Sequence, residues 1–183
     1  MAKIYTRTGD DGDTGLFLGG RVSKADVLVE GYGDVDETVA LLGVARAGAA
    51  EPDLAELLLR LQRELFVVGA DLATHPDRRH HLTDGVSRVT SEMVLALEEL
   101  MDRLVSERPL RPVFVVPGTT ATSAALDHTR AVARRAERHV VAAREAGHAV
   151  SEPVAHYLNR LSDLLFVLAR HAAGEVEEPA SHD

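Results

Sequence analysis

The sequence contains no cysteine and no tryptophan, and aromatic residues make up only 4% of its 183 residues. Without cysteine, there is no disulfide framework, no thiol nucleophile and no cysteine-ligated metal site. No apolar run approaches the length of about 18 residues that a membrane-spanning helix needs, and Met1–Tyr5 lacks the apolar stretch of a signal peptide. These absences predict a soluble cytoplasmic protein that has no membrane partner.

Positive charge is also scarce. The chain has 20 lysines and arginines against 29 aspartates and glutamates, which gives a formal net charge of −9. Proteins that bind nucleic acid generally present a basic surface, so this balance argues against a nucleic-acid partner. A local basic pocket is still compatible with this net negative charge.

Alanine, leucine and valine dominate the composition, and apolar residues recur at helical spacing, so we expect an all-α fold. The expected helices of a five-helix bundle span residues 34–49, 53–73, 91–107, 120–146 and 153–173. Residues 1–33 are too rich in glycine for a helix and predict an ordered Gly/Asp/Thr-rich loop segment. Residues 1–173 then form a single domain, and residues 174–183 form a frayed, flexible acidic tail.

The helix predicted over residues 120–146 carries a narrow polar stripe. Arg130, Arg134 and Glu137 project within roughly 60° of one another at helical spacing. Ser123 and Asp127 point the same way, whereas His128, Arg135 and His139 point to the opposite side. Such a stripe must face water or a charged ligand, and arginines at this spacing suit the oxygens of a polyphosphate.

The N-terminal segment offers a second candidate phosphate site. Thr6–Gly15 combines glycines, whose backbone N–H groups can surround a phosphate, with threonine hydroxyls. No Gly-Lys-Ser/Thr follows, so the segment is not a Walker A motif, and its acidic spacing does not match an EF-hand. Lys24 lies within reach of such a loop. The alternatives are a flexible N-terminus and an ordinary surface lysine.

The last two helices carry polar stripes opposite their leucine faces. In the helix at 153–173, the stripe opposite the leucines consists of Asn159, Asp163, Phe166 and Arg170. A second polar face indicates a subunit contact or a ligand cleft, and the alternative is an ordinary solvated surface. The nine histidines do not form a recognisable metal motif, and no nucleophile elbow is present.

Taken together, these segments resemble the trimeric five-helix-bundle class of ATP:cob(I)alamin (corrinoid) adenosyltransferases. The motifs that carry the resemblance are Lys3–Asp10 with Gly12 and Thr14, Tyr32–Glu37, Pro117–Gly118 leading to Arg130 and Arg134–Arg138, and Tyr157–Asp163. The resemblance covers Lys3 to Arg170. It implies that Co(I) of a reduced corrinoid attacks C5′ of ATP, forming adenosylcobalamin (coenzyme B12) and releasing triphosphate.

The resemblance also implies roles for individual residues in sites that lie between the subunits of a homotrimer. Those expected to hold ATP, with Mg²⁺ bound through its phosphates, are Thr6, Arg7, Thr8, Gly9, Asp13, Thr14, Lys24, Arg134, Glu137, Arg138 and Asn159. Glu137 is a candidate Mg²⁺ ligand. Arg130 would pair with Asp36 of a neighbouring subunit and, with Arg134, order the catalytic site. Phe114 matches the aromatic residue that excludes the lower axial ligand of cobalt. A corrinoid reductase and a B12-dependent acceptor enzyme would be the partners.

Three departures from the family pattern bear on the rate of reaction. Thr119 replaces a glycine, Asp127 stands where the family usually has histidine, and Thr38-Val39 replaces Leu-Asn. Asp127 would either pair with Arg130 or Arg134 or weaken anion binding. These departures motivate the alternative of a non-catalytic trimer that carries or senses ATP or adenosylcobalamin. A plain structural bundle would explain the leucine stripes but not the polar ones.

Overall fold

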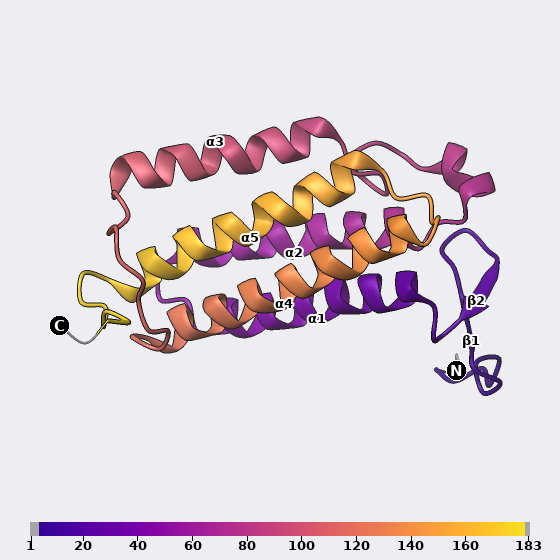
Figure 1. Ribbon diagram of the computed structural model, residues 1–183, viewed down its shortest axis with the longest axis horizontal. Helices are drawn as coiled ribbons and strands as arrows, with labels where there is room; N and C mark the ends of the chain where they lie inside the picture. The colour runs from indigo at the N-terminus through magenta and orange to yellow at the C-terminus, as the bar shows by residue number, and fades with distance from the viewer. Residues whose placement is uncertain (1–3, 182–183) are drawn as a thin grey trace.

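Five long helices form the molecule, and a small hairpin projects from one end (Figure 1). The computed structural model describes residues 4–181, so Lys3, the first residue of the N-terminal motif, lies outside it. The helices are α1 (Val27–Ala47), α2 (Pro52–Leu72), α3 (Ser91–Glu107), α4 (Ala121–Glu145) and α5 (Glu152–Ala173). The all-α prediction is confirmed. Within residues 4–181, no helix has the length and apolarity needed to cross a membrane.

The bounds predicted for α2, α3, α4 and α5 agree with the structure to within one residue. Local start signals explain this agreement. Pro52 and Pro153 occupy first-turn positions, and the Thr90 and Thr120 side chains accept hydrogen bonds from backbone N–H groups of the first turns of α3 and α4.

The predicted start of α1 is wrong by seven residues, because the helix begins at Val27 rather than Asp34. Asp26 caps it by accepting a hydrogen bond from the Leu28 N–H at 2.8 Å. Gly31 lies inside the helix where α1 approaches α4 closely: a Cβ there would lie 3.4 Å from Val140 Cγ2. This glycine therefore permits close helix packing and does not end a helix.

The N-terminal segment forms a short antiparallel hairpin from β1 (Asp13–Gly15) and β2 (Arg21–Ser23), with Thr14 opposite Val22. The Phe17 N–H donates to the Ala73 carbonyl at 2.8 Å, which fastens the hairpin to the end of α2. The connection between α2 and α3 contains a short 3₁₀ helix, η1 (Pro76–His81).

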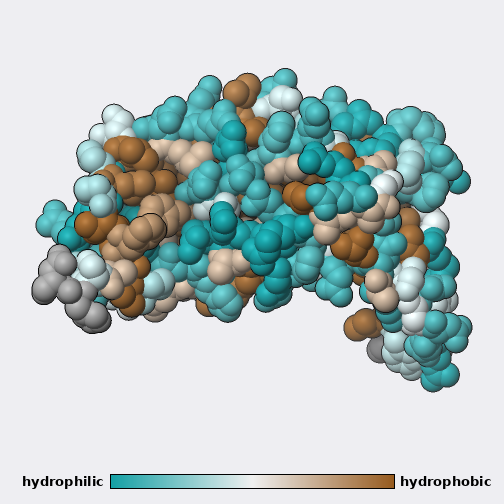
Figure 2. Space-filling view, viewed as in Figure 1, coloured by the Kyte–Doolittle hydropathy of each residue, from teal (hydrophilic) through white to brown (hydrophobic). Residues whose placement is uncertain are grey.

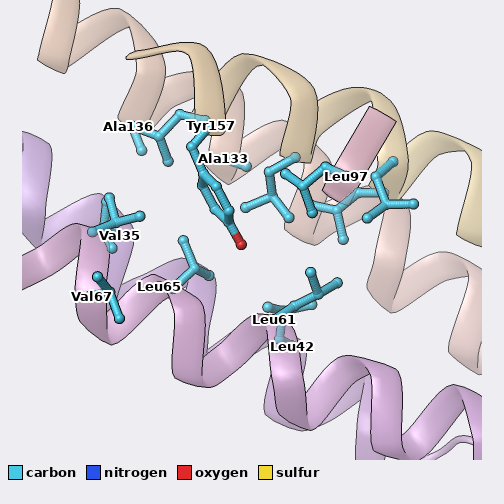
Figure 3. Close-up of a cluster of buried hydrophobic side chains, with 14 of the residues drawn as sticks. Val35, Leu42, Leu61, Leu65, Val67, Leu97, Ala133, Ala136 and Tyr157 are labelled. Atoms are coloured by element: carbon cyan, nitrogen blue, oxygen red, sulfur yellow. The ribbon is translucent and has the colours of Figure 1, made fainter. Parts of the chain in front are cut away.

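The core lies between the helices and centres on Tyr157 of α5 (Figure 3). Its ring is fully buried among leucine, valine and alanine side chains. Its hydroxyl donates to Glu64 Oε2 at 2.7 Å, so the one polar atom of the side chain is satisfied. Burial, followed by the Glu64 charge, raises the pKa of Tyr157 well above its usual value.

The C-terminal segment differs from the frayed tail expected from the sequence. Residues 174–181 run beside the connection between α3 and α4, at the end of the bundle far from the hairpin (Figure 1). Pro179 forms an antiparallel bridge with Val115, and Glu177 is buried. Through these contacts, the tail satisfies backbone groups of the connection, including the Val116 N–H and the Phe114 carbonyl.

Candidate functional site

The polar stripe of α4 divides into a buried half and an open half. Ser123 and Asp127 face the protein interior, with 1% and 6% of their surfaces exposed, whereas Arg134 is exposed. Within residues 4–181, the Arg134 side chain has no ion-pair or hydrogen-bond partner, and only its carbonyl is used, by Arg138 Nη1 at 3.1 Å. The open half therefore presents guanidinium groups that are free to bind an anion.

Glu137 and Asn159 join the open half of the stripe to α5. Asn159 Nδ2 donates to Glu137 Oε1 at 2.9 Å, and Asn159 Oδ1 accepts from Arg160 Nη1 at 2.5 Å. Arg160 in turn donates to Glu98 of α3 at 2.6 Å. This chain of bonds fixes the Glu137 carboxylate and the Asn159 amide in orientation, as a binding site requires.

Arg135 and His139 point away from this surface, as predicted, and face α1. Arg135 Nε donates to Asp34 Oδ1 at 2.9 Å, and His139 Nδ1 lies 2.7 Å from Asp34 Oδ2. Arg135 also pairs with Glu37. The hydrogen bond to Asp34 raises the pKa of Arg135. The sequence motif that contains Asp34 therefore joins α1 to α4, a pairing that the sequence analysis did not identify.

The N-terminal loop is held in shape by its own polar groups. Lys24 Nζ donates to the Gly9 carbonyl at 2.7 Å, and the Thr6 and Thr8 hydroxyls lie 2.8 Å apart. An ammonium group has three donors, so Lys24 can close the loop and still bind a phosphate. The remaining predicted residues of this loop, Arg7, Asp13 and Thr14, lie on the same hairpin segment.

The predicted ATP and corrinoid residues lie at opposite ends of one chain. His148 Nε2, just after α4, lies 3.2 Å from Asp26 Oδ1 at the start of α1, which places the hairpin near the C-terminal end of α4. Phe114 precedes the other end of α4 and is 89% exposed. The 25 residues of α4 separate these ends by about 37 Å at the helical rise per residue. One chain therefore does not bring the N-terminal loop and Phe114 into one site.

An apolar groove lies between α1 and α2, with a volume of about 540 Å³. Phe17, Tyr32, Val39 and Phe66 contribute to its walls, and Asp36 is the one acidic group among the lining residues. Burial raises the pKa of Tyr32, and the nearby Asp26 charge adds to this shift. A groove of this kind suits a protein surface that carries a matching cation.

Asp127 pairs mainly with Arg170 of α5, a partner that the sequence analysis did not identify. Arg170 Nη2 donates to Asp127 Oδ2, whereas Arg130 Nε lies 3.9 Å from Asp127 Oδ1. Of the two partners expected, Arg130 is at this longer distance, and no contact to Arg134 is present in residues 4–181. The Asp127 charge is thus neutralised inside the bundle.

Among the described residues, no cluster of three or more histidine, aspartate or glutamate side chains could hold a metal ion. Mg²⁺ usually keeps several waters and binds through one or two carboxylates together with substrate phosphates. The separate carboxylates of Asp13 and Glu137 fit that form of binding and do not fit a metal cage built from protein groups alone.

Comparison with known proteins gives one consistent result. The cobalamin adenosyltransferase family model matches residues 4–172. A corrinoid adenosyltransferase from Citrobacter freundii is 41% identical over 172 residues, covering 93% of this chain and 94% of the relative. Another from Mycobacterium leprae is 43% identical over 175 residues, covering 94% and 92%.

Solved structures agree with the sequence matches. A variant PduO-type ATP:corrinoid adenosyltransferase from Lactobacillus reuteri, complexed with cobalamin and ATP, superposes with a TM-score of 0.87 at 30% identity. The alignment covers 98% of this chain and 100% of that one. A second variant from the same organism, complexed with ATP, gives a TM-score of 0.86 at 30% identity and covers 97% and 100%.

Proposed function

The chain belongs to the cobalamin adenosyltransferase family, and we propose which of its residues carry out the ATP-dependent adenosylation of cobalamin. In this reaction, the 5′-deoxyadenosyl group of ATP passes to cob(I)alamin, and triphosphate leaves. Because Co(I) is itself a strong nucleophile, the protein has to position the substrates and stabilise the charge of the leaving group. The absence of an activated serine or cysteine is therefore compatible with catalysis.

ATP binds between the N-terminal loop and the open half of the α4 stripe. The loop contributes backbone N–H groups of Thr6–Gly9, the Thr14 hydroxyl and the Lys24 ammonium. The α4 stripe contributes Arg134 and Arg138, and α5 contributes Asn159, which the Glu137 carboxylate orients. These cations and amides lower the energy of the triphosphate as negative charge develops on it. Mg²⁺ would bind through the phosphates, with Asp13 or Glu137 as a carboxylate ligand.

A complete site requires a second copy of the chain, because Phe114 and the N-terminal loop lie at opposite ends of the subunit. A closed homotrimer would place the groove between α1 and α2 of one subunit against the α4 and α5 stripes of the next. Asp36 in that groove would then meet Arg130 of the neighbouring subunit. The Arg130 side chain is 34% exposed, and Asp127 Oδ1 lies 3.9 Å from its Nε, which supports an external partner for the exposed part of its guanidinium.

Phe114 would lie on the corrinoid side and occupy the lower axial position of cobalt. It is part of an exposed apolar patch, made of Val113, Phe114, Val116 and Val176, and Figure 2 shows hydrophobic side chains gathered at this end of the bundle. An apolar patch beneath a large planar macrocycle excludes water and other axial ligands from its lower face. The reductase, the B12-dependent acceptor enzyme and the cytoplasmic location stay predictions.

The observation that carries this assignment is the pairing of Glu137 and Asn159 next to an unpaired Arg134. Anaerobic mixing of chemically reduced cob(I)alamin with Mg-ATP and the protein tests it. We expect loss of the Co(I) absorbance and appearance of a light-sensitive alkylcobalamin. An Arg134→Ala variant that turns over like the wild type would refute the proposed ATP site. ATP binding without any product would favour the carrier alternative.

A further inference from the structure

The C-terminal segment 174–181 makes contacts that its acidic sequence does not suggest. It lies along the connection between α3 and α4, which carries Phe114 (Figure 1). The Val116 N–H donates to the Glu178 carbonyl at 2.8 Å, and the Ala180 N–H donates to the Phe114 carbonyl at 2.8 Å. The second of these bonds holds the backbone of Phe114 itself, and the first holds Val116 two residues further on, although the Phe114 side chain is exposed.

Two arginines from the same connection strengthen this attachment. Arg108 donates to the Gly174 carbonyl and, at 3.3 Å, to the His171 carbonyl. Arg111 Nη1 donates to the Glu177 carbonyl at 3.2 Å. The connection is thereby tied to the C-terminal segment both before and after Phe114. The position of Phe114 consequently depends on where the segment lies.

The segment is anchored in turn by a buried group of charges, which we call the tail anchor: Asp127 of α4, Arg170 of α5 and Glu177. Their exposed fractions are 6%, 7% and 8%. Arg170 donates to Asp127 and lies 2.9 Å from Glu177 Oε1 through its Nε, as an ion pair without an aligned hydrogen bond. Its guanidinium also stacks over the Phe166 ring, 5.1 Å from the centroid.

The tail anchor accounts for Asp127, the departure from the family pattern with the largest change in charge. Two carboxylates share one guanidinium in a buried place, and Arg130, 3.9 Å from Asp127, supplies the fourth charge. Buried charges persist only when they are paired in this way. Without the Glu177 side chain, the segment would be held against the connection by hydrogen bonds of its backbone groups, including those that accept from Arg108 and Arg111.

We propose that Glu177 is a positioning residue, and that the tail anchor holds the C-terminal segment so that Phe114 is presented to the corrinoid. This inference rests on the proposed role of Phe114. It assigns the acidic tail a part in handling cobalamin and none in binding ATP, because the hairpin lies at the other end of the bundle.

The test compares Glu177→Gln with a matched control, Glu178→Gln. Gln at 177 keeps the shape of the side chain and removes its charge. Glu178 is exposed and contributes only its carbonyl to the connection, so its variant should behave as the wild type. We expect Glu177→Gln to raise KM for cob(I)alamin roughly tenfold, since breaking a buried charge pair is costly, and to leave KM for ATP unchanged.

Two further readouts keep the result decisive. Hydrogen exchange of the Val116 and Ala180 amides should accelerate in Glu177→Gln but not in Glu178→Gln. In a variant truncated after Gly174, which lacks Ala180, exchange of the Val116 amide should accelerate as well. The absorbance signature of four-coordinate cob(II)alamin, formed in the presence of ATP, should weaken in both altered proteins and in Phe114→Ala. Unchanged exchange, or an unchanged KM for cob(I)alamin despite faster exchange, would overturn the positioning role.

The proposed function and this inference can fail separately. If the wild type makes no adenosylcobalamin, the proposed function fails, and amide exchange still shows whether Glu177 holds the connection. If the wild type is active and Glu177→Gln affects ATP and cob(I)alamin equally, a general structural role replaces the positioning role.

Discussion

The proposed contact between Asp36 and Arg130 of neighbouring subunits can be measured as a coupling energy. In the isolated chain, Asp36 is exposed in the groove between α1 and α2, and the Arg130 side chain is 34% exposed. Assembly would remove both groups from water. Removing one partner of a buried pair costs roughly 3–5 kcal/mol, whereas an exposed pair contributes less than about 1 kcal/mol.

For the Asp36–Arg130 pair, the structure favours a cost near the lower end of the roughly 3–5 kcal/mol range for buried pairs. Arg130 Nε is already buried, but Asp127 lies 3.9 Å away and supplies part of the compensating charge. We therefore expect Asp36→Asn to weaken each interface by about 3 kcal/mol, which is roughly a hundredfold in the association constant.

A double-mutant cycle with Arg130→Met separates this contact from the effect of Arg130 on Asp127. Sedimentation velocity over a range of concentrations, with turnover measured at each one, reports assembly and activity together. Glu30→Gln, an exposed change on α1 outside the groove lining, serves as the control. Strictly additive single effects, or unchanged trimers with unchanged turnover in Asp36→Asn, would refute the contact.

Three further changes give distinct outcomes. Arg134→Ala should lower kcat/KM for ATP by about 100-fold with an unchanged far-UV circular dichroism spectrum, because it removes a donor to the leaving triphosphate. Asp34→Asn should lower the free energy of unfolding by about 2 kcal/mol in urea titrations, because Arg135 loses a charged partner but stays half-exposed. Tyr157→Phe should cost about 1 kcal/mol near pH 8 through loss of the bond to Glu64. Because the folded pKa of Tyr157 is raised, the wild type should lose stability as pH rises above about 10. This loss should be smaller in the variant.

Local signals in the sequence explain why four helices could be predicted and the start of the first could not. Pro52, Thr90, Thr120 and Pro153 act on the turns next to them, so they can be read without any tertiary information. Gly31 depends on Val140, which is more than a hundred residues away. A glycine that permits a helix crossing has the same sequence appearance as a glycine that ends a helix.

In the site, too, features set by neighbouring residues could be predicted, whereas contacts between residues far apart in the sequence could not. Helical spacing predicted that Arg134 and Glu137 share one face of α4 and that Asn159 lies on the polar face of α5. Only the family resemblance predicted that these two faces form one site. Asp34 pairs with Arg135, and Arg170 pairs with Glu177. Each pair joins two elements whose positions relative to each other cannot be predicted from a local sequence pattern. The acidic composition of the tail indicated solvent exposure, and only the buried Arg170 makes Glu177 a structural residue.

The surroundings of Asp127 also decide between the catalytic and the carrier hypotheses. From the sequence, its carboxylate lay on the arginine stripe and could have weakened triphosphate binding. In the structure, it is turned toward Arg170 and neutralised there, while Arg134 stays unpaired about two turns further along α4. A charge balanced inside the bundle exerts little field on an anion bound at the open half of the stripe. Asp127 therefore helps to hold together the end of the bundle that carries Phe114, and it leaves unpaired the Arg134 side chain that we propose to bind the triphosphate.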